Sequence, residues 1–522
     1  MSNFGDHPAG FFGVSGFYNG VTSSSLRANH GDSPGLLRTM VTGTSRRIFT
    51  WSGWVKRTGI QTNTETFMQV NPNNNDTGAT MFGFRDKDDT DGPNIQFTHY
   101  NGSSYDFRIE TTAKLRDVSS WYHILLRVDT TQGTNSNRIR IYINGDLQTS
   151  LAQNTYPSEN FDTNYNVNSS KMYVAGGAAA NAGGGNVYFD SYITEINYVD
   201  GLSLGPDSFG ETKNGVWIPI NPVVSDYGNN GFRLQFKNSG TGTTSEGTTA
   251  TTNIGDDSSG SGHNFSVLNY VTSDVVLDHP EINFATLNSV IRQYSTDNFF
   301  AEGNLRFDCN SSGVTDQAHS TIALQQDAGG KWYAECRLNT QANGSTWIGV
   351  VRDVPKLAGG LYTAATRSNG YAYKIDGNKT TTENDGASYG NSYTAGDVIG
   401  IALDLDNDQI FFYKNGTIQN SGTAAFTSIT ALDNGTADTS QHFVFGADTD
   451  PQNDFTFNFG QDSTFHAAVS AGGNADADGR GDFKYTVPTG YLAVCAANLP
   501  EPTIGPNSNT QADDHFNTAI WT

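Results

Sequence analysis

The chain has 522 residues, and its 30 Lys and Arg against 53 Asp and Glu give a formal net charge of −23. This length predicts two or three domains. The acidic balance argues against nucleic-acid binding and against docking on anionic lipid, because both need clustered Lys and Arg. The sequence has no run of about 18 apolar residues, so no membrane insertion is expected.

Two further absences concern the cell compartment. The first 20 residues lack the basic and apolar pattern of a secretory signal, so none is expected. Three cysteines do not make a disulfide framework. Both features predict synthesis in a reducing cytoplasm.

The remaining composition indicates the fold class. Charged residues make up 16% of the chain and aromatic residues 12%, with 58 glycines. Aromatic and β-branched strands separated by Gly, Asn and Asp turns are typical of all-β sandwiches. Disordered chains lack such aromatic residues. The sequence therefore predicts an all-β protein.

Residues 1–35 form an aromatic and glycine-rich segment with neither helical nor strand periodicity. Such a segment is too short to bury a core of its own and must lie on something else. It is either an arm packed on the next domain or an anchor to a larger assembly. The anchor candidates are Phe11, Phe12, Phe17 and Tyr18.

Residues 36–205 are predicted to form a first β-sandwich. Residues 94–100 and 138–143 alternate apolar and polar side chains, as half-buried strands do. Residues 121–128 are apolar enough for a strand buried on both faces. The pair Asn144-Gly145 tolerates positive φ at both positions, which predicts a type I′ hairpin.

Residues 206–284 are expected to be a linker with small β elements and a mobile loop, because short strands flank a Gly/Thr/Ser run at 239–252. Residues 285–497 are predicted to form a second β-sandwich. Residues 498–522 are a Pro-containing tail that could start a further domain, and whether the chain continues beyond Thr522 stays open.

The two halves share a weak internal symmetry. In each, an apolar strand is followed by a turn, an aromatic strand and an Asn-Gly pair, the second pair being Asn415-Gly416. This repetition predicts two sandwiches of related jelly-roll type joined by a β-rich linker.

Motifs in both halves resemble known families. The first half resembles a laminin G-like, concanavalin-type jelly roll through WSGWVKR at 51–57, WYHI at 121–124 and IRIYING at 139–145. The second half resembles a SPRY domain, with spaced motifs in that family's order: GKWYAE at 330–335, WIGV at 347–350, DVIGIALD at 397–404 and IFFYKNG at 410–416. With the Phe-Gly-rich start and NLPEPTI at 498–504, the combination resembles tail-fibre-like proteins of tailed bacteriophages and prophages.

This resemblance implies a virion protein on the tail or capsid surface, made in the host cytoplasm. It implies a tail fibre or adhesin that attaches to a glycan or protein receptor by multivalent, non-catalytic binding. The alternatives are a structural capsid decoration, head fibre or collar protein, and a glycan depolymerase. The implied partners are other virion proteins, the host receptor and further copies of the chain, which are usually trimers in this family.

Enzymatic chemistry finds little support in the residues. Retaining glycan hydrolysis needs two carboxylates about 5 Å apart, and no Glu-x-Asp-x-x-Glu string occurs. Asp190 and Glu195 are expected on opposite faces of a regular strand. Glu335, four residues after Lys331, is interpreted as a cross-strand salt-bridge residue. The histidines form no zinc pattern and no nucleophile motif stands out, so we predict no catalytic residue.

The segment DLDND at 404–408 places three carboxylates in a short span. Asp404, Asp406 and Asp408 are therefore weak candidates for Ca²⁺ ligands. The segment lacks the Gly and the distal Glu of an EF-hand, and a tight hairpin with Asx-turn chemistry is the simpler interpretation. We predict no cofactor and keep Ca²⁺ as a hypothesis.

Binding is predicted at the loops of the sandwich ends, which the sheets hold in place. Tyrosine rings stack on sugar rings, and Asn and Asp side chains hydrogen-bond to sugar hydroxyls. Partial burial with the hydroxyl outward is the alternative for each tyrosine. The candidates are Tyr100, Tyr105, Tyr156, Tyr165, Tyr362, Tyr389 and Tyr393.

Overall fold

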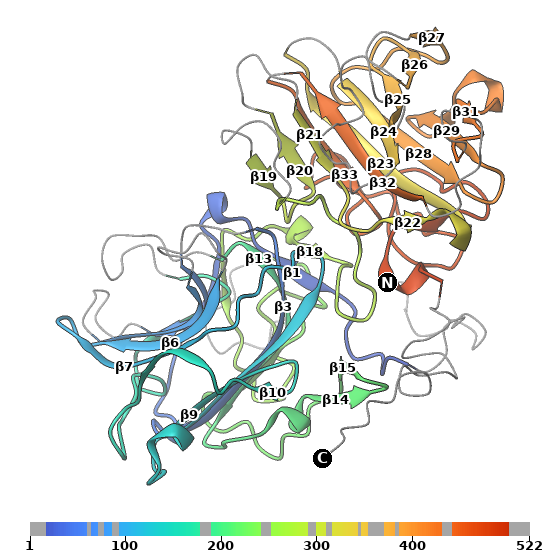
Figure 1. Ribbon diagram of the computed structural model, residues 1–522. Coiled ribbons are helices and arrows are strands. Elements are labelled where there is room, and N and C mark those ends of the chain that lie inside the picture. The colour runs from blue at the N-terminus through green and yellow to red at the C-terminus, as the bar shows by residue number, and fades with distance from the viewer. Residues whose placement is uncertain are drawn as a thin grey trace, which may run out of the picture. The chain divides into compact units, whose positions relative to one another are not determined.

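The computed structural model describes residues 17–59, 64–70, 78–85, 93–177, 189–241, 252–290, 299–309, 316–342, 346–352, 370–381, 386–430, 441–450 and 452–500. These residues form two compact units, 17–281 and 282–500, called the first and second unit below (Figure 1). The all-β prediction is confirmed, and each unit is a sandwich of sheets.

The helices of the described part are single 3₁₀ turns, η1 (His30–Asp32), η2 (Asn135–Asn137), η3 (Pro206–Ser208), η4 (Thr272–Asp274), η5 (Gln326–Ala328), η7 (Asn420–Gly422) and η8 (Ala496–Asn498). Within that part, no helix has the length and hydropathy that a membrane span needs.

The first unit contains two large antiparallel sheets and a small hairpin. The first sheet has the order β10 (Asp146–Leu147), β9 (Ile139–Ile143), β8 (Trp121–Asp129), β3 (Ile48–Arg57), β13 (Ser191–Asp200), β1 (Ser25–Arg27) and β18 (Val275–Val276), with β16 (Phe232–Leu234) on β13. The second sheet has the order β11 (Leu151–Thr155), β7 (Tyr105–Thr111), β6 (Asn94–Tyr100), β5 (Ala79–Arg85), β4 (Glu65–Val70), β12 (Lys171–Val174), β2 (Gly35–Thr39) and β17 (Ser266–Leu268). The hairpin pairs β14 (Gly210–Lys213) with β15 (Val216–Pro219).

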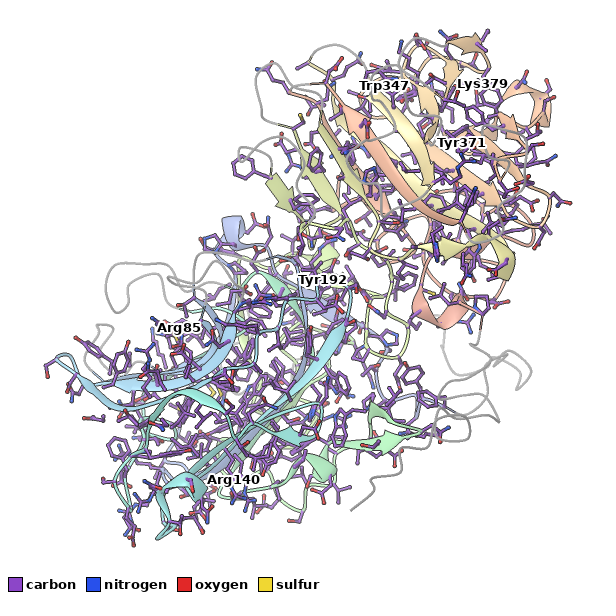
Figure 2. All side chains as sticks on the ribbon, viewed as in Figure 1. Arg85, Arg140, Tyr192, Trp347, Tyr371 and Lys379 are labelled. Atoms are coloured by element: carbon purple, nitrogen blue, oxygen red, sulfur yellow. The ribbon has the colours of Figure 1, made fainter. Side chains whose placement is uncertain are left out.

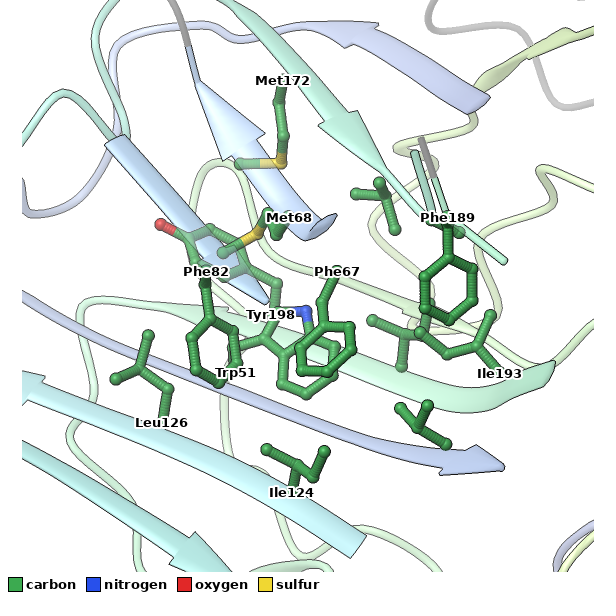
Figure 3. Close-up of a cluster of buried hydrophobic side chains, with 14 of the residues drawn as sticks. Trp51, Phe67, Met68, Phe82, Ile124, Leu126, Met172, Phe189, Ile193 and Tyr198 are labelled. Carbon is green, nitrogen blue, oxygen red and sulfur yellow. The ribbon is translucent and has the colours of Figure 1, made fainter. Parts of the chain in front are cut away.

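An aromatic core holds these two sheets together (Figure 3). Trp51 on β3 stacks on Phe67 of β4, with ring centroids 5.4 Å apart and planes 13° from parallel. Phe82 on β5 meets Trp51 edge-on at 5.2 Å. Gly53 faces the Trp51 ring, and a Cβ there would lie 2.6 Å from it. Successive side chains of a strand point to opposite faces, so one set from each strand enters this core and the other set points outward.

The segment 206–281, expected as part of a linker, belongs to the first unit. Its strands β16, β17 and β18 extend the two sheets, and Phe232, Leu234 and Phe265 are fully buried in the core. Short apolar strands separated by polar loops resemble a linker in sequence, and only their pairing with distant strands shows that they complete the sandwich.

The second unit also contains two sheets. One has the order β19 (Phe299–Ala301), β20 (Arg306–Asp308), β33 (Asp454–Asn458), β23 (Lys331–Thr340), β28 (Val398–Asp404), β29 (Gln409–Lys414) and β30 (Thr417–Ile418), with β31 (Phe426–Thr427) on β29 and β34 (Leu492–Ala493) on β23. The other has the order β21 (Asp316–His319), β32 (His442–Thr449), β24 (Thr346–Arg352), β25 (Gly370–Lys374), β26 (Asn378–Thr380) and β27 (Ala387–Ser388), with β22 (Leu324–Gln325) on β32.

Both Asn-Gly hairpin predictions are confirmed. Asn144 and Gly145 have φ of 48° and 85°, and Asn415 and Gly416 have φ of 47° and 77°. In each hairpin the Asn side-chain oxygen accepts a backbone N–H from the preceding strand of its sheet, at 2.8 Å from His123 and at 2.9 Å from Val398. The shared geometry agrees with the repeat expected between the two halves.

Carboxylates hold several loops in place. The Glu281 carboxylate accepts the backbone N–H groups of Asn19, Gly20 and Thr22 at 3.1, 2.9 and 2.8 Å. Asp200 accepts those of Thr44 and Ser45 at 2.7 and 3.0 Å. These bonds satisfy loop donors that no strand pairs, so part of the acidic excess has an architectural use.

Candidate functional site

The candidate site is the outward face of the second sheet in the first unit. Phe82, Phe97 and Ile109 point into the core, so the residues that alternate with them point away from it. We call the outward set the polar face. It comprises Thr66, Gln69, Met81, Gly83, Arg85, Asn94, Gln96, Thr98, Tyr100, Tyr105, Arg108, Glu110 and Tyr173.

Strand register makes the polar face continuous. Tyr173 pairs with Gln69, Gln69 with Met81, Met81 with Thr98, and Thr98 with Arg108. Because partner residues in an antiparallel sheet share a face, these five side chains form one row across β12, β4, β5, β6 and β7. Parallel to it, a second row contains amide, hydroxyl and carboxylate groups.

A β-bulge shapes the middle of the polar face. The register of β4 against β5 shifts between Thr66 and Met68. Gly83 lies opposite this bulge, where a Cβ would come within 2.0 Å of the Glu65 carbonyl oxygen. Only glycine lets the two backbones approach so closely, and the bulge turns Thr66 and Gln69 to the outward side.

Two buried oxygens of the polar face have no hydrogen-bond partner. Gln69 is 1% exposed and Thr66 is fully buried, yet neither Gln69 Oε1 nor Thr66 Oγ1 makes a hydrogen bond. A buried polar group without a partner costs about 1–3 kcal/mol, and such groups are rare in native proteins.

The charged groups of the polar face are two guanidinium groups and one carboxylate, and they lie together. Arg108 Nη2 lies 2.7 Å from Glu110 Oε2, and Arg85 Nε lies 3.6 Å from the same oxygen. Asn94 Nδ2 donates to Glu110 Oε1 at 3.1 Å, and Arg85 is labelled in Figure 2. Glu110 is the one carboxylate among the residues of the polar face, so the face holds no carboxylate pair for glycan hydrolysis.

The predicted tyrosines have four different outcomes. Tyr165, Tyr389 and Tyr393 are 0%, 5% and 3% exposed and belong to the two cores, so their prediction as binding residues is wrong. Tyr156 packs half-buried against the first core, and Tyr362 lies outside the described residues. Tyr100 and Tyr105 lie on the polar face, and Tyr105 is 43% exposed.

The three acidic candidates for Ca²⁺ point to different partners. Asp404 pairs with Lys331 at 2.7 Å. Asp406 accepts the Gly330 N–H at 2.7 Å. Asp408 accepts the Thr430 N–H and hydroxyl at 3.0 and 2.7 Å. These carboxylates serve the hairpin and its neighbours and do not converge on one point.

Glu335 differs from its predicted role. Lys331 pairs with Asp404 across the sheet, so a salt bridge at Glu335 is wrong. Glu335 is fully buried, and its carboxylate accepts the backbone N–H groups of Lys484 and Tyr485 at 2.8 and 2.9 Å. Burial raises its pKa to about 7. Its function is to hold the 484–485 segment against β23.

Asp190 and Glu195 do not form a catalytic pair. The strand that was expected to be regular is bulged between Thr194 and Asn197, and Glu195 has φ of 49°. Glu195 Oε2 lies 2.8 Å from Arg233 Nη2, while Asp190 Oδ1 accepts the His30 N–H at 3.2 Å. Each carboxylate has its own structural partner.

The anchor candidates separate in the same way. Phe11 and Phe12 lie outside the described residues. Phe17 is 4% exposed, and Lys213 Nζ donates to its carbonyl oxygen at 2.7 Å. Because Phe17 packs inside the first unit, it is not available as an anchor. Tyr18 is 39% exposed.

Sequence reasoning missed Gln69 and Thr66. Strict alternation in ETFMQV, residues 65–70, would place Phe67 and Gln69 on one face, and the bulge breaks that period. The glycine at position 83, inside an otherwise regular strand, was the available signal of a bulge or close approach.

Two family models match the chain in separate regions. Residues 31–201 match the concanavalin A-like lectin/glucanases superfamily, and residues 331–462 match the SPRY domain. The chain therefore contains a concanavalin-like domain followed by a SPRY domain, as its motifs imply. The virion setting is not tested by these matches and stays a prediction.

The individual similarities are partial. A stretch of 62 residues is 47% identical to the E3 ubiquitin-protein ligase RKP of Arabidopsis thaliana, and this match spans 12% of the chain and 5% of the plant protein. The SPRY domain of human HERC1 is 18% identical, with 33% of this chain and 96% of that chain covered and a TM-score of 0.25. A heptameric SAP-like pentraxin from Limulus polyphemus is 16% identical, with 35% and 76% covered and a TM-score of 0.25.

Proposed function

We propose that the chain is a non-catalytic attachment protein whose polar face binds glycans on a host surface. The observation that carries the proposal is the pair of buried, unpartnered oxygens at Gln69 and Thr66. Sugar hydroxyls are the donors that such oxygens lack. Neighbouring Gln96 and Thr98 add further amide and hydroxyl groups in the same register.

The carboxylates favour binding over hydrolysis. Glu110 is held by Arg108, and Glu195 by Arg233. A general acid and a nucleophile must be free to exchange protons or attack carbon, and these carboxylates are engaged by guanidinium groups. A glycan depolymerase would need a different pair.

The setting that we propose is the tail or capsid surface of a tailed-phage or prophage virion. Several copies in one particle, as a homo-oligomer such as a trimer, would convert weak single-site affinity into tight attachment. Antibody against the chain should label the distal tail of purified virions. Labelling confined to the shell would instead support capsid decoration.

The binding proposal is tested with the full chain on a panel of immobilised oligosaccharides. The substitution Gln69→Leu keeps the size of the side chain and removes its amide, so we expect binding to fall about tenfold, the equivalent of one good hydrogen bond. Gln325→Leu is the matched control, because Gln325 is an exposed residue on β22 of the second unit and is not part of the polar face. Equal binding by both variants would refute the proposal.

A further inference from the structure

The turn between β6 and β7 carries two tyrosines at one end of the polar face. Tyr100 and Tyr105 are register partners, and their ring centroids are 5.3 Å apart in an edge-to-face arrangement. Tyr105 is 43% exposed, which makes it the most exposed aromatic side chain among the described residues of the first unit. An exposed aromatic ring offers a flat apolar surface on which a ligand can stack.

A second side chain of the polar face, Arg108, contacts the Tyr105 ring. The Arg108 guanidinium carbon lies 5.3 Å from the Tyr105 ring centroid. The same guanidinium donates from Nε and Nη2 to Glu110 Oε2 at 3.2 and 2.7 Å. The anchored guanidinium and the neighbouring Tyr100 ring therefore restrict the Tyr105 ring, which lowers the entropy lost when a ligand stacks on it.

Side-chain hydrogen bonds also fix the turn itself. Asn101 Oδ1 accepts the N–H groups of Ser103 and Ser104 at 3.0 Å each. Asn101 Nδ2 donates to Asp106 Oδ1 at 2.7 Å, and Asp106 Oδ2 lies 3.4 Å from His99 Nε2. His99 is buried beside Phe107. Asp106 thus connects the turn to the core and is a positioning residue.

We propose that Tyr105, positioned by Tyr100 and Arg108, is a stacking platform that selects a neutral hexopyranose at one end of the glycan site. This inference rests on the proposed function and names its substrate class. A pyranose whose C–H bonds gather on one ring face matches a flat tyrosine ring in size and polarity.

Charge decides between neutral and acidic sugars. The Arg108 guanidinium beside the platform already lies 2.7 Å from Glu110 Oε2, so its attraction for a sugar carboxylate is weakened. The Asp106 side chain is 34% exposed next to it, and the chain carries a net charge of −23. A uronic acid would meet like charge there.

The test compares neutral β-gluco- and β-galacto-oligosaccharides with oligogalacturonate, using the full chain. We expect Tyr105→Ala to weaken neutral binding about tenfold and Tyr105→Phe to retain it within about twofold, because the ring and not the hydroxyl stacks. Tyr18→Ala is the matched control, since Tyr18 is 39% exposed in an edge-to-face pair with Phe17. We expect no change from that control.

The outcomes separate the two proposals. If Gln69→Leu abolishes binding while Tyr105→Ala does not, the platform is refuted and the glycan site stands. Tighter binding of oligogalacturonate than of neutral sugars also overturns the platform's selectivity. If the wild type binds none of the three probes, the proposed function fails and the platform fails with it. Asp106→Asn, which keeps the bond from Asn101, should leave affinity within about twofold.

Discussion

Two buried polar sites on outward sheet faces, one in each unit, differ in their hydrogen bonding. In the second unit, the Glu335 carboxylate receives two backbone N–H groups and lies near Asn458 and Tyr333 donors at 3.3 and 3.4 Å. In the first unit, Gln69 Oε1 and Thr66 Oγ1 receive none. We expect the satisfied carboxylate to stabilise the fold, and we propose that the two unsatisfied oxygens receive an external donor.

The largest effect is expected at Glu335, whose carboxylate has hydrogen-bond partners. Glu335→Ala leaves the Lys484 and Tyr485 N–H groups buried without an acceptor, so it should lower the free energy of unfolding of the second unit by about 3 kcal/mol. Chemical denaturation of the full chain measures this. Asp327→Ala, which removes an exposed carboxylate on η5, is the control. A loss below about 1 kcal/mol for Glu335→Ala would show that Glu335 does not hold the 484–485 segment in place.

The same group should give the second unit a distinctive pH dependence. Burial raises the pKa of Glu335 from 4.5 to about 7 in the folded state, so its contribution is fully present below pH 4.5 and is lost as the pH rises through 7. Relative to Glu335→Gln, wild-type stability should therefore fall between pH 5 and 7.5, by at most about 1.4 kcal/mol per pH unit.

Other titrating groups contribute equally to the wild type and to Glu335→Gln. Burial also raises the pKa of Asp308, which gives a slope of the same sign in both. Partial burial raises the pKa values of Asp397 and Asp404, but hydrogen bonds, first among them those from Asn415 and Lys331, outweigh it and hold both pKa values below their usual range. These carboxylates therefore change stability only below pH 4. Burial lowers the pKa of His319 to about 4, which gives the opposite slope below pH 6.5. The wild type and Glu335→Gln share that slope, so it cancels when their stabilities are subtracted. Parallel stability curves would contradict the account of Glu335.

The smallest effect on stability is expected at Gln69, whose side-chain oxygen has no hydrogen-bond partner. Gln69→Leu replaces a buried oxygen that has no partner with an apolar group of similar size, so the stability of the first unit should stay the same or rise by up to about 1 kcal/mol. Thermal denaturation measured alongside Gln325→Leu checks this. A loss of about 2 kcal/mol would mean that the Gln69 oxygen already has a partner.

Local sequence signals predicted the fold well. The Asn144-Gly145 and Asn415-Gly416 turns follow from backbone sterics alone, and alternation placed strands such as β6 and β9 near their observed bounds. The segment 206–281 was misassigned because its contribution depends on pairing with strands far away in sequence. Long-range pairing is not encoded in local periodicity.

The site was only partly predictable for a related reason. Tyr100 and Tyr105 flank a recognisable turn and were named from sequence. Tyr165 was misread because a loop tyrosine can point into the core, where its hydroxyl donates to the Met68 carbonyl at 3.0 Å. Gln69 needed the bulge at Thr66, which changes the facing of every later residue on the strand.

Hydrogen–deuterium exchange of the full chain tests the glycan site most directly. It is measured with and without the neutral oligosaccharide that binds most tightly in the panel. We predict slower exchange in β4 to β7, residues 65–70, 79–85, 94–100 and 105–111, and no change in the second unit. Protection confined to residues 370–430, or no protection at saturating sugar, would contradict the assignment of the polar face.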